Sequence, residues 1–494
     1  MIMKKTMNKF SLLLMAGIIA FTSCDKQLSV EPRQSISFES ALTSAANVEA
    51  ALNSVYGGLR QQTEYGRDKL AVADALADLV QATGKSGRLQ PENRNTQGAH
   101  FANWGSSYGL LNEINLILEA IPNIADASTA TKDRWEGELK FLRALLHHDL
   151  ARSYAYDTTA VVSGQYRGNV VLALTATKTG GGALEFRPSR ASTKEVYDAI
   201  YADLTVATTK LANTRGVYYA TKASAHALFS RVALYYGDWA KAVTEANNAI
   251  SNAAGVGAVL STGANYVTGW RALRNPESFF EVRFNIQNEN LGVNVSLQTS
   301  YTTLAALGNT GTTAGFGDLV PNNFLMGQLG IATTGFPNIT RGADVRANLY
   351  EWGTSGRGTR FIECTKFFGK SGFPNLDNVP VIRYPEVLLN RAEAALRRNA
   401  AGDEAAALAD LNSVLTNRGL TSVTLSGAAL MAEIMRQRAL EFAFEGHRWF
   451  DLKRTGQDIV KAPANLPFND TRVLPAIPQR EIDGNPNMKQ NAGY

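Results

Sequence analysis

The stretch from Ile434 to Arg454 reads IMRQRALEFAFEGHRWFDLKR, and it mixes charged residues with large aromatic ones. Its periodicity predicts one amphipathic helix that runs into a turn. The apolar stripe of this helix comprises Met431, Met435, Ala439 and Phe442. Beside the stripe, charged residues lie three or four positions from a partner of opposite sign: Arg438, Glu441, Glu445 and Arg448. We therefore expect ion pairs held against a core, where they must be fully hydrogen-bonded or they cost stability.

The overall composition is typical of a globular protein. The chain has 494 residues, of which 45% are hydrophobic and 19% are charged, so it can bury an ample core. Its net charge is +5, and three of the positive charges are lysines in the first 23 residues, which leaves +2 for the remainder. This small charge, without a basic stripe interleaved with aromatic residues, argues against a nucleic-acid partner.

The beginning of the chain has the pattern of an export signal. Residues 1–23 carry a lysine-rich start and an apolar run at 10–21, which is shorter than the roughly 20 apolar residues that span a bilayer. Small residues precede Cys24, as in a bacterial lipoprotein signal, so we expect Cys24 to be the lipidated first residue of the mature protein, followed by a polar tether at 24–36. The alternative is an ordinary signal peptide with an incidental cysteine. Only Cys364 would then remain, so no internal disulfide is predicted.

Several segments together resemble the RagB/SusD family of outer-membrane lipoproteins for nutrient uptake. The stretch quoted first matches the family block I..ER..E...EG.RW.DL.R at Ile434, Arg438, Glu441, Glu445, Gly446, Arg448, Trp449, Asp451, Leu452 and Arg454. Gln437 stands where the family has Glu, which puts one implied ion pair in question. Further matches lie in the E...LRA segment that contains Arg143, in residues 275–282, in the D-x-R motif at 344–346 and in the closing segment at 475–494.

This resemblance implies a fold and a role. The fold would be mostly α, with tetratricopeptide-like helical hairpins forming a right-handed superhelical scaffold, long loops and a few short strands, in one domain over 37–494 whose signature occupies 430–494. The protein would be exposed at the cell surface and anchored to the outer membrane by lipid at Cys24. It would capture a glycan or another oligomeric nutrient and pass it to a SusC-like TonB-dependent transporter, without catalysing a reaction.

The residue pattern independently predicts helical hairpins. Residues 222–250 read as two helices joined by Gly237-Asp238-Trp239, and alanines in the second helix would let the two helices approach closely. Residues 385–398 and 404–415 form a similar pair. Such units bury their apolar faces only by stacking on neighbours. Taken alone, the spacing establishes α-helical hairpins and no more.

Two loop-rich regions interrupt this pattern, at 83–103 and 255–380, and short strands are predicted at 170–172 and 279–284. Long loops in compact domains are often functional. Sugar recognition uses flat aromatic faces together with planar hydrogen-bonding groups. The candidate ligand-binding residues are Arg88, Asn95 and Phe101 in the first region, and Tyr301, Phe316, Asn323 and Phe336 in the second. We expect the ligand where these loops meet; alternatively, the aromatic residues pin the loops to the scaffold. Sugar and peptide ligands both stay open.

No motif makes a positive case for catalysis. The five histidines lack metal-ligand spacing, and no nucleophile elbow is present. Glu441 or Glu445 could act as an acid only if neighbouring arginines did not hold them ionised. No cofactor is predicted, although a structural Ca²⁺ in a loop stays open. Three hypotheses for the function are therefore considered: a binding lipoprotein, a helical-repeat scaffold without sugar specificity, and a surface glycoside hydrolase.

Overall fold

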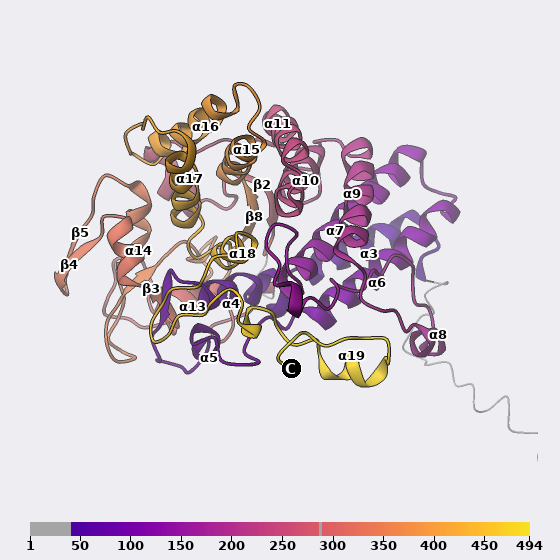
Figure 1. Ribbon diagram of the computed structural model, residues 1–494, viewed down its shortest axis with the longest axis horizontal. Coiled ribbons are helices and arrows are strands. Elements are labelled where there is room, and N and C mark those ends of the chain that lie inside the picture. Colours follow the sequence, from indigo (N-terminus) through magenta and orange to yellow (C-terminus); the bar gives the residue numbers. More distant parts are fainter. Residues whose placement is uncertain (1–40, 286–288) are drawn as a thin grey trace, which may run out of the picture.

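The computed structural model describes residues 41–285 and 289–494, so the predicted signal (1–23), Cys24 and the tether (24–36) lie outside the described residues. The described chain is mostly helical, which confirms the predicted fold class (Figure 1). The longer helices are α3 (Ala45–Gly58), α4 (Asp68–Leu76), α6 (Trp104–Ala120), α7 (Thr129–Tyr154), α9 (Thr193–Lys210), α10 (Lys222–Tyr236), α11 (Trp239–Val256), α12 (Gly263–Arg271), α15 (Tyr384–Arg398), α16 (Asp403–Asn417) and α17 (Gly427–Glu441). The shorter ones are α5 (Gln90–Asn93), α8 (Gly180–Glu185), α13 (Leu297–Tyr301), α14 (Asn323–Gln328), α18 (Arg448–Arg454) and α19 (Gln479–Gly484).

The predicted hairpin at 222–250 consists of α10 and α11. Gly237 ends α10 with a φ of +84°, and the Asp238 side chain accepts a hydrogen bond from the Lys241 N–H at 3.0 Å, which caps α11. Three fully buried alanines face α10 and allow close approach: Ala242, Ala246 and Ala249. The second predicted hairpin consists of α15 and α16, and α11 packs against α15, so the two hairpins stack side by side (Figure 1).

Within the described part of the chain, the strands form four antiparallel two-stranded ribbons. Their members are β1 (Val80–Ala82) with β3 (Leu319–Pro321), β2 (Ser278–Val282) with β8 (Val379–Arg383), β4 (Ala332–Gly335) with β5 (Asn338–Thr340), and β6 (Tyr350–Trp352) with β7 (Ile362–Cys364). The strand predicted near 279–284 is β2. The strand predicted at 170–172 is wrong, because the Val171 carbonyl accepts a hydrogen bond from the Tyr108 side chain on α6 and the segment joins no ribbon among the described residues.

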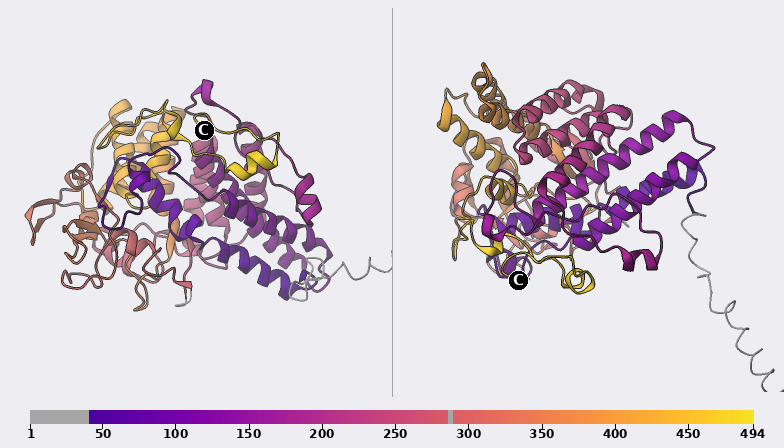
Figure 2. Two further views of the ribbon diagram at one scale, coloured as in Figure 1. Left: turned by 90° about the horizontal axis from the view of Figure 1, so that it is seen from below. Right: turned by 45° about the vertical axis from the view of Figure 1, so that its right-hand side comes forward.

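The irregular region gathers at one end of the molecule. Figure 2 shows the loops that carry β4 and β5 on the opposite side from α3, α6 and the N-terminal half of α7. The first and last described segments share one hydrophobic core, which includes Leu42 and Met488. None of the helices within 41–285 and 289–494 is both long enough and apolar enough to cross a membrane.

The stretch at 434–454 forms two helices instead of the predicted one. α17 ends at Glu441, and α18 begins at Arg448 after a turn in which Phe444 and Gly446 adopt positive φ values of 65° and 75°. The predicted apolar stripe is partly wrong, because Met431 and Met435 are only half-buried. The buried face of α17 instead presents Leu430, Ile434, Gln437, Arg438 and Glu441. The polar residues of this face can be buried because they pair with charged side chains in the interior of the protein.

The predicted ion pairs form, but with partners from distant parts of the chain. Glu441 accepts hydrogen bonds from Arg418 (Nε to Oε2, 2.8 Å) and from Arg383 (Nη1 to Oε1, 2.9 Å). Glu445 lies 2.7 Å from Arg383 Nη2 and 2.6 Å from Lys366 Nζ. All five side chains are buried. The expected pairing between neighbours on one helix is therefore wrong: Arg438, although it lies on α17 with Glu441, pairs with Asp451, and α17 ends before Glu445 and Arg448.

Glu277 completes this buried network. Its carboxylate lies 2.6 Å from Arg383 and 2.8 Å from Arg418, so Arg418 bridges two acids and Arg383 bridges three. Outside the network, Arg438 pairs with Asp451 at 3.3 Å and Arg448 with Asp78 at 2.7 Å. Because Glu277 precedes β2 and Arg383 ends β8, the network joins the irregular region to the helical scaffold.

Gln437 replaces the expected carboxylate without leaving its partner unpaired. Its side-chain oxygen accepts a hydrogen bond from Arg346 at 2.8 Å. Arg346 also pairs with Asp344 of the D-x-R motif at 2.7 Å and lies 3.5 Å from Glu441. The substitution therefore exchanges one ion pair for a neutral hydrogen bond, while the charge of Arg346 stays balanced.

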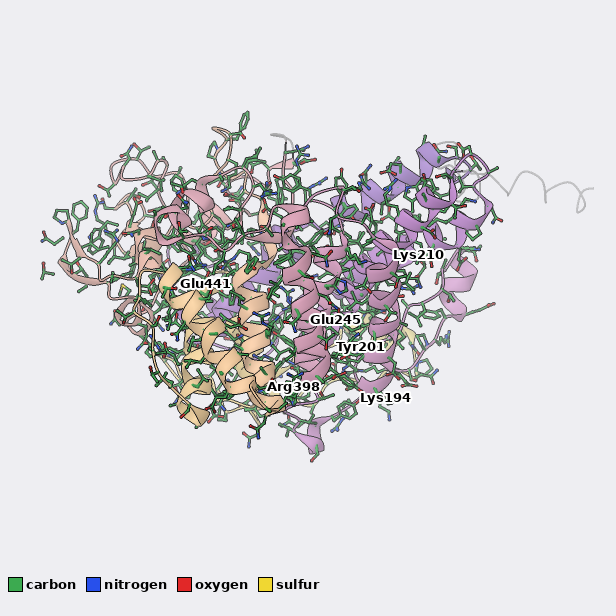
Figure 3. The ribbon with its side chains drawn as sticks, turned by 90° about the horizontal axis from the view of Figure 1, so that it is seen from above. Lys194, Tyr201, Lys210, Glu245, Arg398 and Glu441 are labelled. Carbon is green, nitrogen blue, oxygen red and sulfur yellow. The ribbon has the colours of Figure 1, made fainter. Side chains whose placement is uncertain are left out.

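Replacing Glu441 with alanine should leave buried arginines without their shared carboxylate. We expect the free energy of unfolding to fall by about 3–5 kcal/mol, the usual cost of breaking a buried pair. Arg398→Ala is the matched control: it removes a pair with Asp403 at the end of α15 (Figure 3), which is partly exposed and should contribute about 1 kcal/mol or less. Urea denaturation followed by circular dichroism measures both, and equal losses would contradict the prediction.

Gly446→Ala should also destabilise the fold, because the backbone leaves no room for a side chain. A Cβ atom at Gly446 would lie 2.7 Å from Leu70 Cα and from the Lys69 carbonyl oxygen on α4. Left-handed backbone alone costs about 1–2 kcal/mol for other residues. Gly427→Ala carries that strain only, since nothing lies within 4 Å of its Cβ position. The loss at Gly446 should exceed the loss at Gly427 in the same denaturation assay, and the reverse order would refute the clash.

Candidate functional site

The two predicted loop regions meet beside the β1–β3 ribbon, as the sequence predicts. Val80 pairs with Pro321, and Ala82 pairs with Leu319. Beyond the ribbon, the Thr83 N–H donates to the Asp318 carbonyl at 2.9 Å. The Thr83 hydroxyl donates to the Gly317 carbonyl at 2.7 Å. The start of the first loop is thus fixed against the second.

A charged and aromatic cluster lies where these loops meet. Arg88 pairs with Asp318 at 2.7 Å, and Asp318 also accepts a hydrogen bond from the Ser86 hydroxyl. Burial raises the pKa of Asp318, although Ser86 and Arg88 oppose this shift. The guanidinium carbons of Arg88 and Arg357 lie 4.0 and 3.9 Å from the centroid of the half-buried Phe316 ring. These are distances at which a cation is attracted to an aromatic face.

A second aromatic group lies on the β4–β5 hairpin. Phe336 is 46% exposed and meets the Trp352 ring edge-on, with 5.9 Å between the centroids. The guanidinium carbon of Arg360 lies 4.2 Å from the Phe336 centroid, and Arg360 donates to the Gly353 carbonyl at 2.9 Å. We call these two groups together the loop surface: Arg88, Phe316, Phe336, Trp352, Arg357 and Arg360. It combines flat apolar faces with planar donors.

Comparisons with known proteins identify the family. Residues 28–234 match a family model described as "Starch-binding associating with outer membrane", and residues 361–464 match the SusD family model. Two relatives from Formosa agariphila, SusD-like proteins P38 and P2, are each 24% identical to this chain, covering 100% and 99% of it and the whole of each relative.

The chain belongs to the SusD family.

Solved structures share its fold. A SusD superfamily protein from Bacteroides vulgatus is 24% identical and superposes with a TM-score of 0.78, covering 92% of this chain and 99% of that one. A laminarin-binding SusD-like protein is 21% identical, with a TM-score of 0.67, and covers 92% of this chain and 100% of that one. The scaffold of this SusD-family protein is therefore shared by proteins with little sequence identity to it.

The structure places the predicted ligand-binding residues in different surroundings. Arg88, Phe316 and Phe336 belong to the loop surface, and Asn323 is exposed at the first residue of α14. Sequence reasoning missed Trp352, Arg357 and Arg360, although the run Arg357-Gly358-Thr359-Arg360-Phe361 carries a signal: two arginines next to a ring in a glycine-containing loop.

Three predicted ligand-binding residues are buried, and we assign them to packing instead. The Asn95 amide donates to the Leu76 carbonyl at 3.1 Å, and the Phe101 ring stacks on Phe450 with 5.4 Å between centroids. The Tyr301 hydroxyl donates to Asp74 Oδ2 at 2.8 Å. Their exposed fractions are 3%, 6% and 0%. These side chains pin the loops to the scaffold, which is the alternative weighed from the sequence.

The family-signature residues hold the scaffold of the SusD-family protein together. Arg143 makes two hydrogen bonds of 2.7 Å to Asp203, and so ties α7 to α9. Trp239 opens α11 and packs its ring near Arg397, at 5.2 Å from the guanidinium carbon. Trp449 is fully buried. The Arg143 and Trp239 contacts each join two separate helices.

The buried signature acid Glu441 is poorly suited to proton transfer. Burial favours the neutral form of Glu441, but Arg418 and Arg383 outweigh this and hold its pKa well below the usual range. His147 and His148 are buried in α7, and burial lowers the pKa of both. Across the described ranges, no group of three or more His, Cys, Asp or Glu side chains is placed to hold a metal ion.

Asp74 should make stability depend on pH. Burial raises the pKa of Asp74 to about 7, against the opposing hydrogen bonds from Tyr301 and the Gly446 N–H. An unfolded Asp has a pKa of about 3.9, so between these values the folded protein binds more protons, and the stabilising contribution is lost as pH rises to 7. Asp74→Asn, which stays neutral, should make the decline in unfolding free energy from pH 5 to 7 shallower. Urea denaturation at each pH tests this, with the exposed Asp198→Asn as control; an unchanged slope in Asp74→Asn would contradict it.

Proposed function

We propose that this protein is a lipoprotein of the outer membrane, exposed at the cell surface and anchored through Cys24. It binds a glycan on the loop surface and delivers it to a SusC-like TonB-dependent transporter. The family model's description and the laminarin-binding relative of similar fold support glycan binding at a membrane. Transfer to a transporter and anchoring at Cys24 follow from the family resemblance of the sequence.

The observation that carries this proposal is the exposed Phe336 ring, which lies beside Trp352 and the Arg360 guanidinium on the loop surface. A sugar ring has an apolar face that stacks on an aromatic ring, and hydroxyls that need planar hydrogen-bonding partners. Arg357 is held by the Gly315 carbonyl at 2.9 Å, and Arg360 by the Gly353 carbonyl at 2.9 Å. Because these side chains are already ordered, binding costs less conformational entropy.

The same surface favours binding over hydrolysis. Glycoside hydrolases place two carboxyl groups on either side of the bond that they cleave. Two carboxylates lie close to this part of the loop: Arg88 and Ser86 engage both oxygens of Asp318, and the buried Glu363 accepts hydrogen bonds from Thr302 and Thr303. Asp318 is therefore a structural partner of the loop. A ligand bound here would be released unchanged to the transporter.

Removing a ring from the loop surface should weaken glycan binding. Phe336→Ala and Phe316→Ala should each raise the dissociation constant about tenfold, because an aromatic contact contributes about 0.5–1.5 kcal/mol beyond the area it buries. Phe373→Ala is the control, since Phe373 is also exposed, at 39%, but lies outside this surface. Native affinity electrophoresis in gels containing laminarin, starch or other surface polysaccharides measures retardation.

The assay separates the competing functions. Retardation of the wild type without released sugar, reduced in Phe336→Ala and not in Phe373→Ala, supports the proposal. Released sugar would support a hydrolase instead. A mild-detergent pull-down completes the test: co-purification with a transporter is expected, and co-purification with other proteins and no retardation on any glycan would favour a scaffold.

A further inference from the structure

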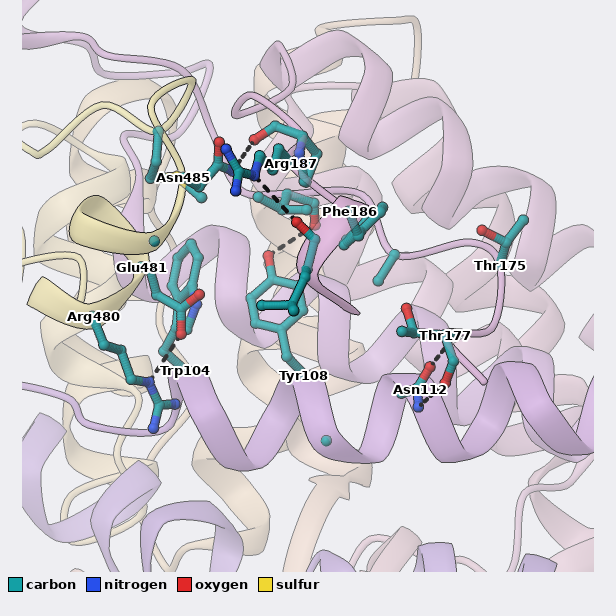
Figure 4. Close-up of a pocket in the computed structure, with 17 residues that line it drawn as sticks. Trp104, Tyr108, Asn112, Thr175, Thr177, Phe186, Arg187, Arg480, Glu481 and Asn485 are labelled. Atoms are coloured by element: carbon teal, nitrogen blue, oxygen red, sulfur yellow. Dashed lines mark hydrogen bonds and ion pairs between the residues drawn. The ribbon is translucent and has the colours of Figure 1, made fainter. Parts of the chain in front are cut away.

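A second recess lies away from the loop surface, between α6, the segment that contains α8, and α19. Figure 4 shows Trp104, Tyr108 and Asn112 on α6 facing this recess, with Phe186 and Arg187 on one side and Arg480 and Glu481 on another. Its volume is about 520 Å³. Pockets of about 300–1,000 Å³ are typical of small-molecule sites. None of the residues predicted from the sequence to bind ligand lines it.

The walls of this pocket are fixed before any ligand binds. The Tyr108 hydroxyl donates to the Val171 carbonyl at 2.8 Å. The Asn112 amide makes two hydrogen bonds to the Thr177 backbone, at 2.7 and 3.1 Å. On the opposite side, the Asn485 amide donates to the Pro188 carbonyl at 2.7 Å. Segments from three distant parts of the chain are thereby held in place, so a ligand would enter a formed site.

Large apolar side chains lie both in the wall of the pocket and at its mouth. Trp104 and Tyr108 lie against each other in its wall, with 4.8 Å between their ring centroids. At the mouth, on and just after α8, Leu184 and Phe186 are 74% and 46% exposed. Large apolar side chains with this exposure next to a recess are characteristic of binding sites. These groups suit the apolar face of a flat or ring-shaped ligand.

The remaining polar groups favour an anionic ligand. Arg187 uses Nε to donate to the Leu184 carbonyl, and Arg480 uses Nε to pair with Glu481 at 3.0 Å. The terminal nitrogens of both arginines make no hydrogen bond to any described residue. The lining therefore carries two guanidinium groups and one carboxylate. The free terminal nitrogens of an arginine match the two oxygens of a carboxylate.

Arg480 has a defined place in the pocket. The glycine at position 105 leaves the space in which the Arg480 guanidinium lies against α6, because a Cβ atom there would collide with Arg480 Nη2. Arg480 and Gly105 also line a neighbouring hollow of about 760 Å³. A ligand of several rings therefore has room to extend from the pocket past Arg480.

We propose that this pocket binds an acidic saccharide, with carboxylates at Arg187 and at Arg480 and a sugar face against Tyr108 and Phe186. The hydroxyls of Thr175 and Thr177, which also line the pocket, are placed for sugar hydroxyls. An acyl chain would leave these polar groups unmatched. This inference rests on the proposed glycan-binding function and adds a second site and a substrate class to it.

Titration calorimetry with trigalacturonate, and with maltotriose as the neutral comparison, tests the inference. We expect the wild type to bind trigalacturonate more tightly than maltotriose. Arg187→Gln and Arg480→Gln should each raise the dissociation constant for trigalacturonate about tenfold, because each loses a charge-assisted hydrogen bond. Gly105→Ala should act in the same direction by displacing Arg480. Arg167→Gln is the matched control, since Arg167 is exposed and bonds only to its own loop.

Hydrogen exchange of the full chain locates the site and separates this inference from the proposed function. Trigalacturonate should protect residues 170–190 and 476–490. Protection of residues 312–360 alone, or equal affinity for the two sugars, would overturn the acidic pocket and leave the loop surface as the glycan site. If trigalacturonate binds nowhere, the inference also fails, whereas the polysaccharide gels judge the proposed function independently.

Discussion

The buried carboxylates of Glu277, Glu441 and Glu445 are tolerable only because Arg383, Arg418 and Lys366 reach them. A buried charge without a partner costs several kcal/mol, so the chain must bring all six side chains together or leave them in water. They come from a segment before β2, from the segment after β7, from the end of β8, from the end of α16, and from α17 and the turn after it. The network therefore sets how the irregular region lies on the helices. The stability of this network depends on the presence of all six side chains, since each acid contacts more than one cation.

This constraint explains how long loops can carry a precise surface. Lys366, at the network, follows β7 directly, and the opposite end of the β6–β7 ribbon leads into Arg357 and Arg360. Tyr301 reaches Asp74, and Asp74 also accepts a hydrogen bond from the Gly446 N–H, so α13, α4 and the turn before α18 share one buried acid. The loops are thus held from beneath by polar contacts. Their outer faces are left to present Phe316 and Phe336.

The helical hairpins and the two proposed binding sites occupy different parts of the molecule and have different roles. Hairpins such as α10–α11 are held by small residues and local caps, and they supply rigidity. The loop surface rests on the β1–β3 ribbon, whereas the pocket rests on α6, whose polar side chains Tyr108 and Asn112 hold the chain at 171–177. Both places put an arginine beside an aromatic ring. A protein that captures a long glycan gains from two separated contacts, because the second contact becomes intramolecular.

The sequence by itself determined the features that depend on near neighbours along the chain. Alanine spacing and the Gly237 turn predict the α10–α11 hairpin, and the polar, glycine-containing stretches mark both loop regions. It also predicted that Glu441 and Glu445 would be held ionised by arginines. The tertiary structure alone decided which arginines these are, since α15 and α16 separate Arg383 from α17, and Arg418 lies in the connection that precedes α17. It likewise decided that Asn95, Phe101 and Tyr301 are buried and that segments near 104–112, 171–188 and 480–488 enclose a pocket. Periodicity reports only which side of an element is apolar, whereas exposure and pairing depend on what packs against that side.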